Sequence, residues 1–322
     1  MAFGDLHQSL DRFQQRHRLL GFPFAVFQKY GEDQGGYLAA TISYYGFFSI
    51  FPLLLVFTTI LGYVVEKNSS AYTSLVDSAL GQFPVIGHQL QTHSLTGSGP
   101  ALAIGVVAAL WAGMGVFMAA QNAMDHVWDV PYVERPNFLA SRLRALGLLA
   151  VIGGGLLATT VLAGLGSFGA SYGVGWKIGS IALSTGLNFL LFWVAFRLLT
   201  ARDVTWRQLR GGAVAAAVMY EILQALGGYY VGHVVKGASQ TYGTFALVIG
   251  LLSWVYLAAH ITLLAAESNV VATRHLWPRS LSLVVERPVT EADRDALTDR
   301  AQVEQRRKDE SIDVEFERSS RR

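Results

Sequence analysis

The sequence predicts an all-α membrane protein, a bundle of six transmembrane helices with a kinked first helix and both termini in the cytoplasm. The first observation behind this prediction is the run from Gly35 to Val65, which contains no charged side chain. A hydrocarbon core about 30 Å thick requires about 20 apolar residues of helix. Five further apolar runs of spanning length follow, at Ala101–Ala123, Ala145–Phe168, Ile178–Phe196, Gly211–Val231 and Gly243–Ala266.

The second observation is the distribution of basic residues among the segments that connect these runs. Of the 25 Lys and Arg residues, 22 fall in the N-terminal segment, the second and fourth loops and the tail. The other three loops hold one each, namely Lys67, Lys177 and Lys236. Because basic loops stay in the cytoplasm, we expect both termini to lie inside.

Composition supports the membrane assignment and limits the chemistry. Hydrophobic residues make up 52% of the 322 residues and charged residues 15%, whereas charged residues reach about 25% in soluble domains. The chain has no cysteine, which excludes a disulfide framework and a thiolate metal site. We predict no metal, no cofactor and no nucleic-acid partner, and the oligomeric state stays open.

We place the transmembrane domain at residues 35–270, and three segments are expected to lie outside the bundle of spanning helices. Residues 1–34 carry Phe3, Leu6, Leu10 and Phe13 at helical spacing beside arginines, typical of an amphipathic helix on the cytoplasmic surface or of one packed on the protein's own loops. Residues 66–99 are too apolar for a free loop and should cap the outer face. Residues 271–322 form a charged cytoplasmic tail that we expect to be largely disordered and dispensable for folding.

Glu221 is the most unusual residue of the predicted spans. It shares one face of the fifth run with Ala213, Ala217 and Ala225, and small residues at four-residue spacing mark close helix packing. Helical rise places it about 15 Å from Gly211, near the midplane, where an ionised carboxylate costs roughly 3 kcal/mol or more. It is therefore either a neutral, hydrogen-bonded packing residue or part of a translocation or proton-coupling pathway.

Further polar residues of the spans are candidates for the same pathway. His260 and Glu267 are seven residues apart and thus on one side of the last helix. A lone intramembrane histidine often only packs, and Glu267 could instead bind basic loop residues or cap a helix. The full candidate set for translocation or binding is Glu221, Gln224, Asn188, Asn122, His260, Glu267 and Asn269. The sequence does not show whether their faces converge.

Pro52 lies inside the first predicted span. It cannot donate a hydrogen bond to the carbonyl of Phe48, and its ring crowds the preceding turn, so we expect a kink there. Interrupted helices often form transporter binding sites, but they also occur where a helix bends around its neighbours.

Several motifs together resemble the YihY/BrkB family of bacterial inner-membrane proteins. The first span reads AATISYYGFFSIFPLLL at residues 39–55. The last span has YG at 242–243, WVY at 254–256 and AAESN at 265–269, and the second cytoplasmic loop has RP at 135–136 with Arg142 downstream. Ala265 departs from the glycine that is common in the family. The resemblance implies a six-span protein of the bacterial cytoplasmic membrane but no defined activity.

Three classes of function are open for these residues. The buried polar groups and the interrupted first span favour a transporter, channel or flippase for an envelope lipid, an amphiphile or an ion. The alternatives are a membrane scaffold and a hydrolase, because members of this family have been labelled ribonucleases. The eight histidines are scattered and show no HExxH pattern, so the sequence argues against an enzyme.

Overall fold

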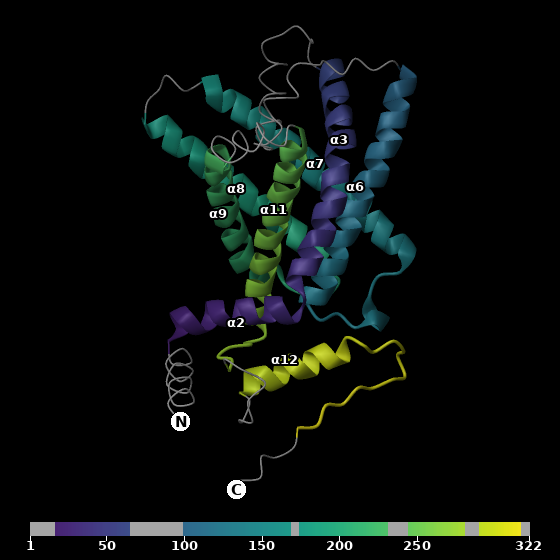
Figure 1. Ribbon diagram of the computed structural model, residues 1–322, viewed down its shortest axis with the longest axis vertical. Helices are drawn as coiled ribbons and strands as arrows, with labels where there is room; N and C mark the ends of the chain where they lie inside the picture. Colours follow the sequence, from purple (N-terminus) through teal and green to yellow (C-terminus); the bar gives the residue numbers. More distant parts are fainter. Residues whose placement is uncertain (1–16, 65–98, 169–173, 231–243, 281–289, 317–322) are drawn as a thin grey trace.

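The computed structural model describes residues 17–64, 99–168, 174–230, 244–280 and 290–316, and this described part is helical without strands. Six long helices form the body of the molecule (Figure 1). They are α3 (Gly35–Val64), α6 (Gly99–Val127), α7 (Phe138–Phe168), α8 (Val174–Leu199), α9 (Trp206–Tyr230) and α11 (Thr244–Thr273). Each apolar run predicted from the sequence overlaps one of them.

Four stretches of the described residues are long and apolar enough to cross a membrane. They are Phe138–Gly155, Ala182–Leu199, Trp206–Gly227 and Val248–Thr273. For the described residues, the prediction of an all-helical protein with helices able to span a membrane is therefore confirmed. α3 runs through Pro52 as one helix, and the predicted kink at that residue stays a prediction.

α11 is the central helix, because it contacts α2, α3, α6 and α9. Each long helix also contacts the next one along the chain, and α11 returns to α3, so the six helices close into a ring. Glycines permit close approach within it: a Cβ added to Gly46 would lie 3.0 Å from Val255 of α11.

Three short elements complete the described fold: α2 (Arg18–Glu32), η1 (Tyr132–Glu134) and α12 (Glu291–Gln302). α2 and α12 both lie across the same ends of the long helices (Figure 1), and we call this the α2 end. The predicted amphipathic pattern of residues 3–13 and nearly all of the predicted outer segment, residues 66–99, lie outside the described residues.

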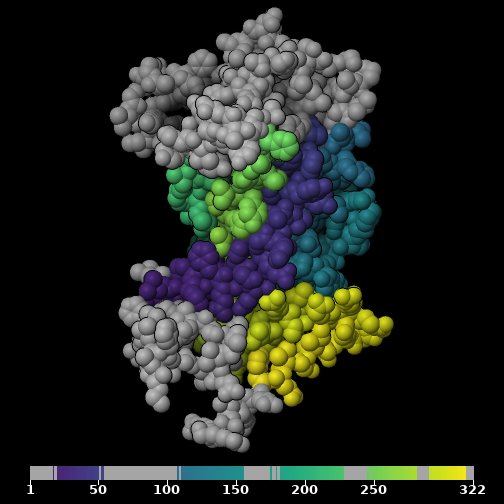
Figure 2. Space-filling view, in the orientation of Figure 1, coloured from purple at the N-terminus to yellow at the C-terminus, as the bar shows by residue number. Residues whose placement is uncertain are grey.

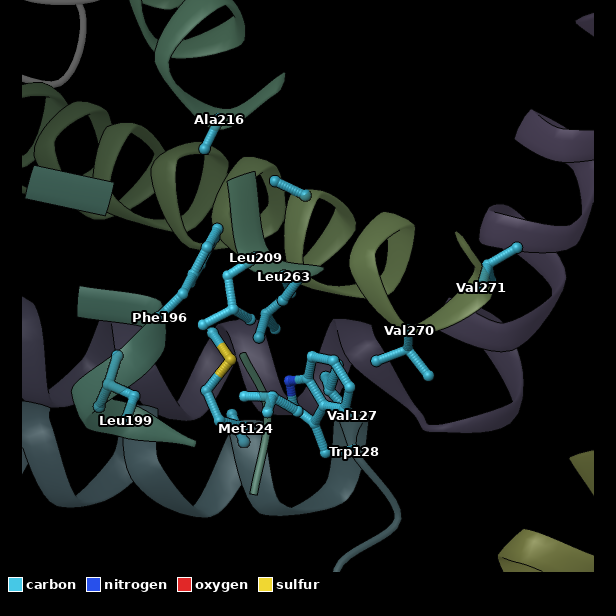
Figure 3. Packing of buried hydrophobic residues seen from close by; sticks show 14 of the residues in the cluster. Met124, Val127, Trp128, Phe196, Leu199, Leu209, Ala216, Leu263, Val270 and Val271 are labelled. Carbon is cyan, nitrogen blue, oxygen red and sulfur yellow. The ribbon is translucent and has the colours of Figure 1, made fainter. Parts of the chain in front are cut away.

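The best-buried apolar side chains gather at the α2 end. Met124 of α6, Leu209 of α9 and Leu263 of α11 point toward one another (Figure 3), and Phe196 of α8 joins them. All four are fully or almost fully buried. Among the described residues, these side chains thus join four helices at the end that α2 crosses.

The C-terminal tail differs from the expected disordered segment, because residues 290–316 include a docked helix. Thr290 and Asp293 form a capping box that starts α12. Arg279 then joins α12 to α2, donating to Asp293 at 3.0 Å and to both carboxylate oxygens of Glu32 at 2.9 Å. In Figure 2 the surface of α12, in yellow, lies below and to the right of that of α2 and meets its right-hand end. Buried ion pairs thus join the tail to α2, and Ala296 of α12 packs in the main hydrophobic cluster.

Candidate functional site

Glu221 and Asn188 are brought together where α8 packs on α9. The Glu221 Oε1 atom accepts hydrogen bonds from Asn188 Nδ2 at 2.8 Å and from Ser184 Oγ at 2.9 Å. Ser184 and Asn188 lie four residues apart, so one face of α8 presents both donors. Ser184 is exposed and Glu221 is half-buried. We call Ser184, Asn188 and Glu221 the α8–α9 polar cluster.

The small-residue face predicted for α9 is buried only along part of its length. Ala213 and Ala217 are buried, whereas Glu221 is half-buried and Ala225 is exposed. The face therefore begins in the packed α2 end and opens to the surface of the described bundle at Glu221. This arrangement leaves the carboxylate accessible between two helices.

Gln224 lies one turn beyond Glu221 on the same helix. Its Nε2 atom is 3.3 Å from the Tyr220 hydroxyl, and the Tyr220 ring packs edge-on against Phe192 of α8 with centroids 6.0 Å apart. Gln224 thus extends the polar surface of α9 through Tyr220.

His260 and Glu267 face α2 rather than the α8–α9 polar cluster. The Tyr30 hydroxyl hydrogen-bonds to Nδ1 of His260, whose ring also packs edge-on against Tyr256 at 4.2 Å between centroids. Glu267 is fully buried, and its Oε2 atom lies 3.8 Å from Nζ of Lys29. This polar side of α11 therefore packs against α2.

The charged residues around Glu267 form one connected group. Lys29 Nζ lies 2.5 Å from Asp33 and 3.1 Å from Asp129. Arg274 Nη1 lies 3.0 Å from Asp129 and also pairs with Asp299 of α12. We call Lys29, Asp33, Asp129, Glu267, Arg274 and Asp299 the inner ionic cluster. It joins α2, α11, α12 and the segment after α6.

Lys29 stays charged although it is almost fully buried. Burial alone would lower its pKa, but Glu267, Asp33 and Asp129 together raise the pKa above that of a free lysine. For Asp33, burial and the neighbouring Asp129 raise the pKa, and Lys29 opposes this shift. The lysine is thus the fixed cation of the cluster.

Asn269 and Asn122 lie apart from both polar groups. The Asn269 Oδ1 atom accepts from the backbone N–H of Gly212 at 2.6 Å and is buried between α9 and α11. Asn122 is exposed on α6, where its Oδ1 atom is 3.4 Å from Arg135. The first therefore fastens two helices, and the second contacts a basic loop residue.

The predicted residues consequently fall into separate places instead of one cavity. Sequence reasoning missed Ser184, Tyr30 and the acidic partners Asp33 and Asp129, because their roles depend on which helices pack together. The four-residue spacing of Lys29 and Asp33 was the one local signal. In the part of the chain that the structure describes, no group of three or more His, Asp or Glu side chains could hold a metal ion.

Comparisons place the chain among known membrane proteins. A family model described as virulence factor BrkB matches residues 26–282. The ribonuclease-like protein YfkH of Bacillus subtilis is 24% identical over 78% of this chain and 95% of its own length. The inner membrane protein YhjD of Escherichia coli is 24% identical over 78% of this chain and 81% of its own. A UPF0761 membrane protein of Azotobacter vinelandii is 28% identical over 79% of this chain and 64% of its own length. No solved structure matches significantly.

Proposed function

Because the chain belongs to the virulence factor BrkB family of membrane proteins, we propose that it is an inner-membrane transporter, channel or flippase whose solute passes the α8–α9 polar cluster. The observation that carries the proposal is the half-buried carboxylate of Glu221, which α8 holds by two hydrogen bonds to one oxygen. A carboxylate near the midplane is costly unless it binds a proton or a cation or is hydrated. The cluster therefore fits a cation or a cationic headgroup.

The openness of the cluster favours this role over simple packing. A packing carboxyl would be sealed between helices, as Asn269 is, whereas Ser184 is exposed beside Glu221. Envelope lipids, amphiphiles and ions are the solute classes that could reach such a group from the bilayer or from a hydrated groove.

We propose that the protein spans the membrane six times, with both termini in the cytoplasm. α3 and α6 would then be the two spans beyond the four apolar stretches of α7, α8, α9 and α11. Single cysteines in this cysteine-free chain should then react with an impermeant thiol reagent outside intact cells at Ser69, Tyr172 or Ala238. Cysteines at Asn137 or Ser311 should react only after permeabilisation, since basic loops stay inside. External labelling at Ser311 would overturn the orientation.

We further propose that the chain is not a nuclease, although its relative YfkH has a ribonuclease-like name. Metal-dependent hydrolysis needs clustered His and carboxylate ligands. Scattered histidines argue against such a site. A scaffold without transport activity is the remaining alternative, and it predicts no flux above background in the wild type. A transporter in which Glu221 only packs predicts that Glu221 can be replaced without any change in flux.

Glu221→Gln separates these readings. The amide oxygen can still accept from Ser184 and Asn188, so we expect an unchanged melting temperature. Flux should fall about tenfold or more, because a contact to a charged group is worth roughly 1.5–3 kcal/mol. The measurement is uptake by proteoliposomes. A pH-sensitive dye reports proton flux or proton-coupled cation flux, and a fluorescent aminophospholipid reports lipid movement.

The matched control is Glu134→Gln, which alters an exposed carboxylate in η1 and should leave flux unchanged. Flux in Glu221→Gln equal to wild type, with the same pH dependence, would contradict the proposed role of the carboxylate.

A further inference from the structure

The inner ionic cluster contains more carboxylates than its cations can neutralise. Lys29 and Arg274 contact four carboxylates there, those of Asp33, Asp129, Glu267 and Asp299. The nearby Arg202 donates to the Trp128 carbonyl at 3.0 Å. With every group ionised, the cluster would carry an excess of negative charge in a buried place, which is strongly unfavourable.

Glu267 is the carboxylate with the weakest compensation. It is fully buried, and no donor hydrogen-bonds to either of its oxygens. Lys29 lies nearer to Asp33 and Asp129 than to Glu267, at 2.5 and 3.1 Å against 3.8 Å. The lysine charge is therefore shared among three carboxylates.

The carboxyl groups of Asp33 and Glu267 lie beside the same ammonium group, since Lys29 Nζ is 2.5 Å from Asp33 and 3.8 Å from Glu267. Two ionised carboxylates offer only acceptors, so a hydrogen bond between them requires a proton on one. We propose that Asp33 and Glu267 form a proton-binding pair that bridges α2 and α11, with Lys29 as its resident cation. One carboxylic acid then donates to the other carboxylate, and the excess charge of the cluster falls.

The surroundings determine how this pair responds to pH. Lys29 and Tyr30 face the pair from α2, Asp129 from the segment after α6 and His260 from α11. Arg274 lies directly after α11, and Asp299 reaches in from α12. Burial raises the pKa of Asp33. A carboxyl group with a raised pKa in the folded state contributes stability at low pH that is lost as pH rises through that pKa. Above it, both carboxylates would be ionised and would repel α2 from α11.

The inference is independent of the proposed transport function, because its test measures a bound proton and stability rather than flux. The full chain in detergent should show an infrared band of a protonated carboxylic acid, and Glu267→Gln or Asp33→Asn should remove it. The spectrum is recorded above the pKa of Asp125, which burial raises to about 6 despite Arg135 and Arg144. The spectrum of Glu221→Gln serves as a control, because this variant lacks the intramembrane carboxyl group of α9.

Thermal stability gives the second measurement. The melting temperature of the wild type should fall as pH rises. Glu267→Gln should abolish this fall, because the amide of the introduced glutamine can donate to Asp33 at every pH. An ionised Glu267 paired with Lys29 predicts the opposite, a lower melting temperature at every pH and no carboxylic acid band in wild type. A melting temperature that depends on Na⁺ or K⁺ at constant ionic strength, again without the band, would also overturn the proton assignment.

Discussion

Replacing Arg279 with methionine is expected to release α12 from the α2 end and to destabilise the protein by about 3 kcal/mol or more, because an uncompensated buried charge costs roughly 3–5 kcal/mol. The guanidinium is fully buried and bridges Glu32 of α2 to Asp293 of α12. Methionine retains the length of the side chain but no donor. The melting temperature in detergent should fall, and trypsin should cleave faster after Arg294 and Arg300, which lie in α12.

The control for this variant is Arg306→Met. Arg306 pairs with Glu304 on the surface, where both side chains are more than half exposed, and exposed ion pairs contribute little. Equal melting temperatures and equal cleavage rates for Arg279→Met and wild type would show that α12 is not held by this arginine.

Asp293 provides an independent check through pH. Hydrogen bonds from Ser280, Thr290 and Arg279 lower its pKa although burial opposes the shift. A carboxyl group whose pKa is lowered by folding contributes stability at pH values above its pKa in the unfolded chain. This stability is lost as pH falls through its pKa in the folded protein. Cleavage within α12 should therefore accelerate in acid before the transmembrane helices unfold.

The tail shows why local composition was a poor guide to this part of the fold. Its residues offer little apolar surface, which predicted disorder, yet Arg279 reaches Glu32 across 247 residues of sequence. Such a contact has no local signature. The helix start did have one, since Thr290 and Asp293 fit a capping box with a shorter acid at the third position.

The long helices were predictable for the opposite reason. Apolar runs such as Gly35–Val65 have the length and composition that a helix needs to cross the bilayer, and α3 occupies nearly the same residues. The polar sites were predictable only as residue types. That Asn188 meets Glu221, whereas Glu267 meets Lys29, depends on which helix faces which, and periodicity within one helix does not contain that information.

The contact between α9 and α11 depends most sharply on Gly212. A Cβ at this position would lie 2.2 Å from the Ala265 carbonyl oxygen and 2.4 Å from Asn269 Nδ2. Backbone atoms cannot move aside as the end of a flexible side chain can, so the two helices would have to separate. Gly212 and Ala216, both buried, form the small-residue spacing that permits this approach.

Gly212→Ala is therefore expected to destabilise the protein by about 3 kcal/mol, at the upper end of the usual cost of overpacking, and to lower its melting temperature and its yield in the membrane. Gly211→Ala is the matched control, because its Cβ would meet only Asn269 Oδ1 at 3.8 Å and alanine favours a helix. Adding Asn269→Ala should not rescue Gly212→Ala, since the clash with the Ala265 carbonyl remains. If Gly212→Ala were as stable as Gly211→Ala, α9 and α11 could not approach as closely as the Gly212–Asn269 hydrogen bond requires.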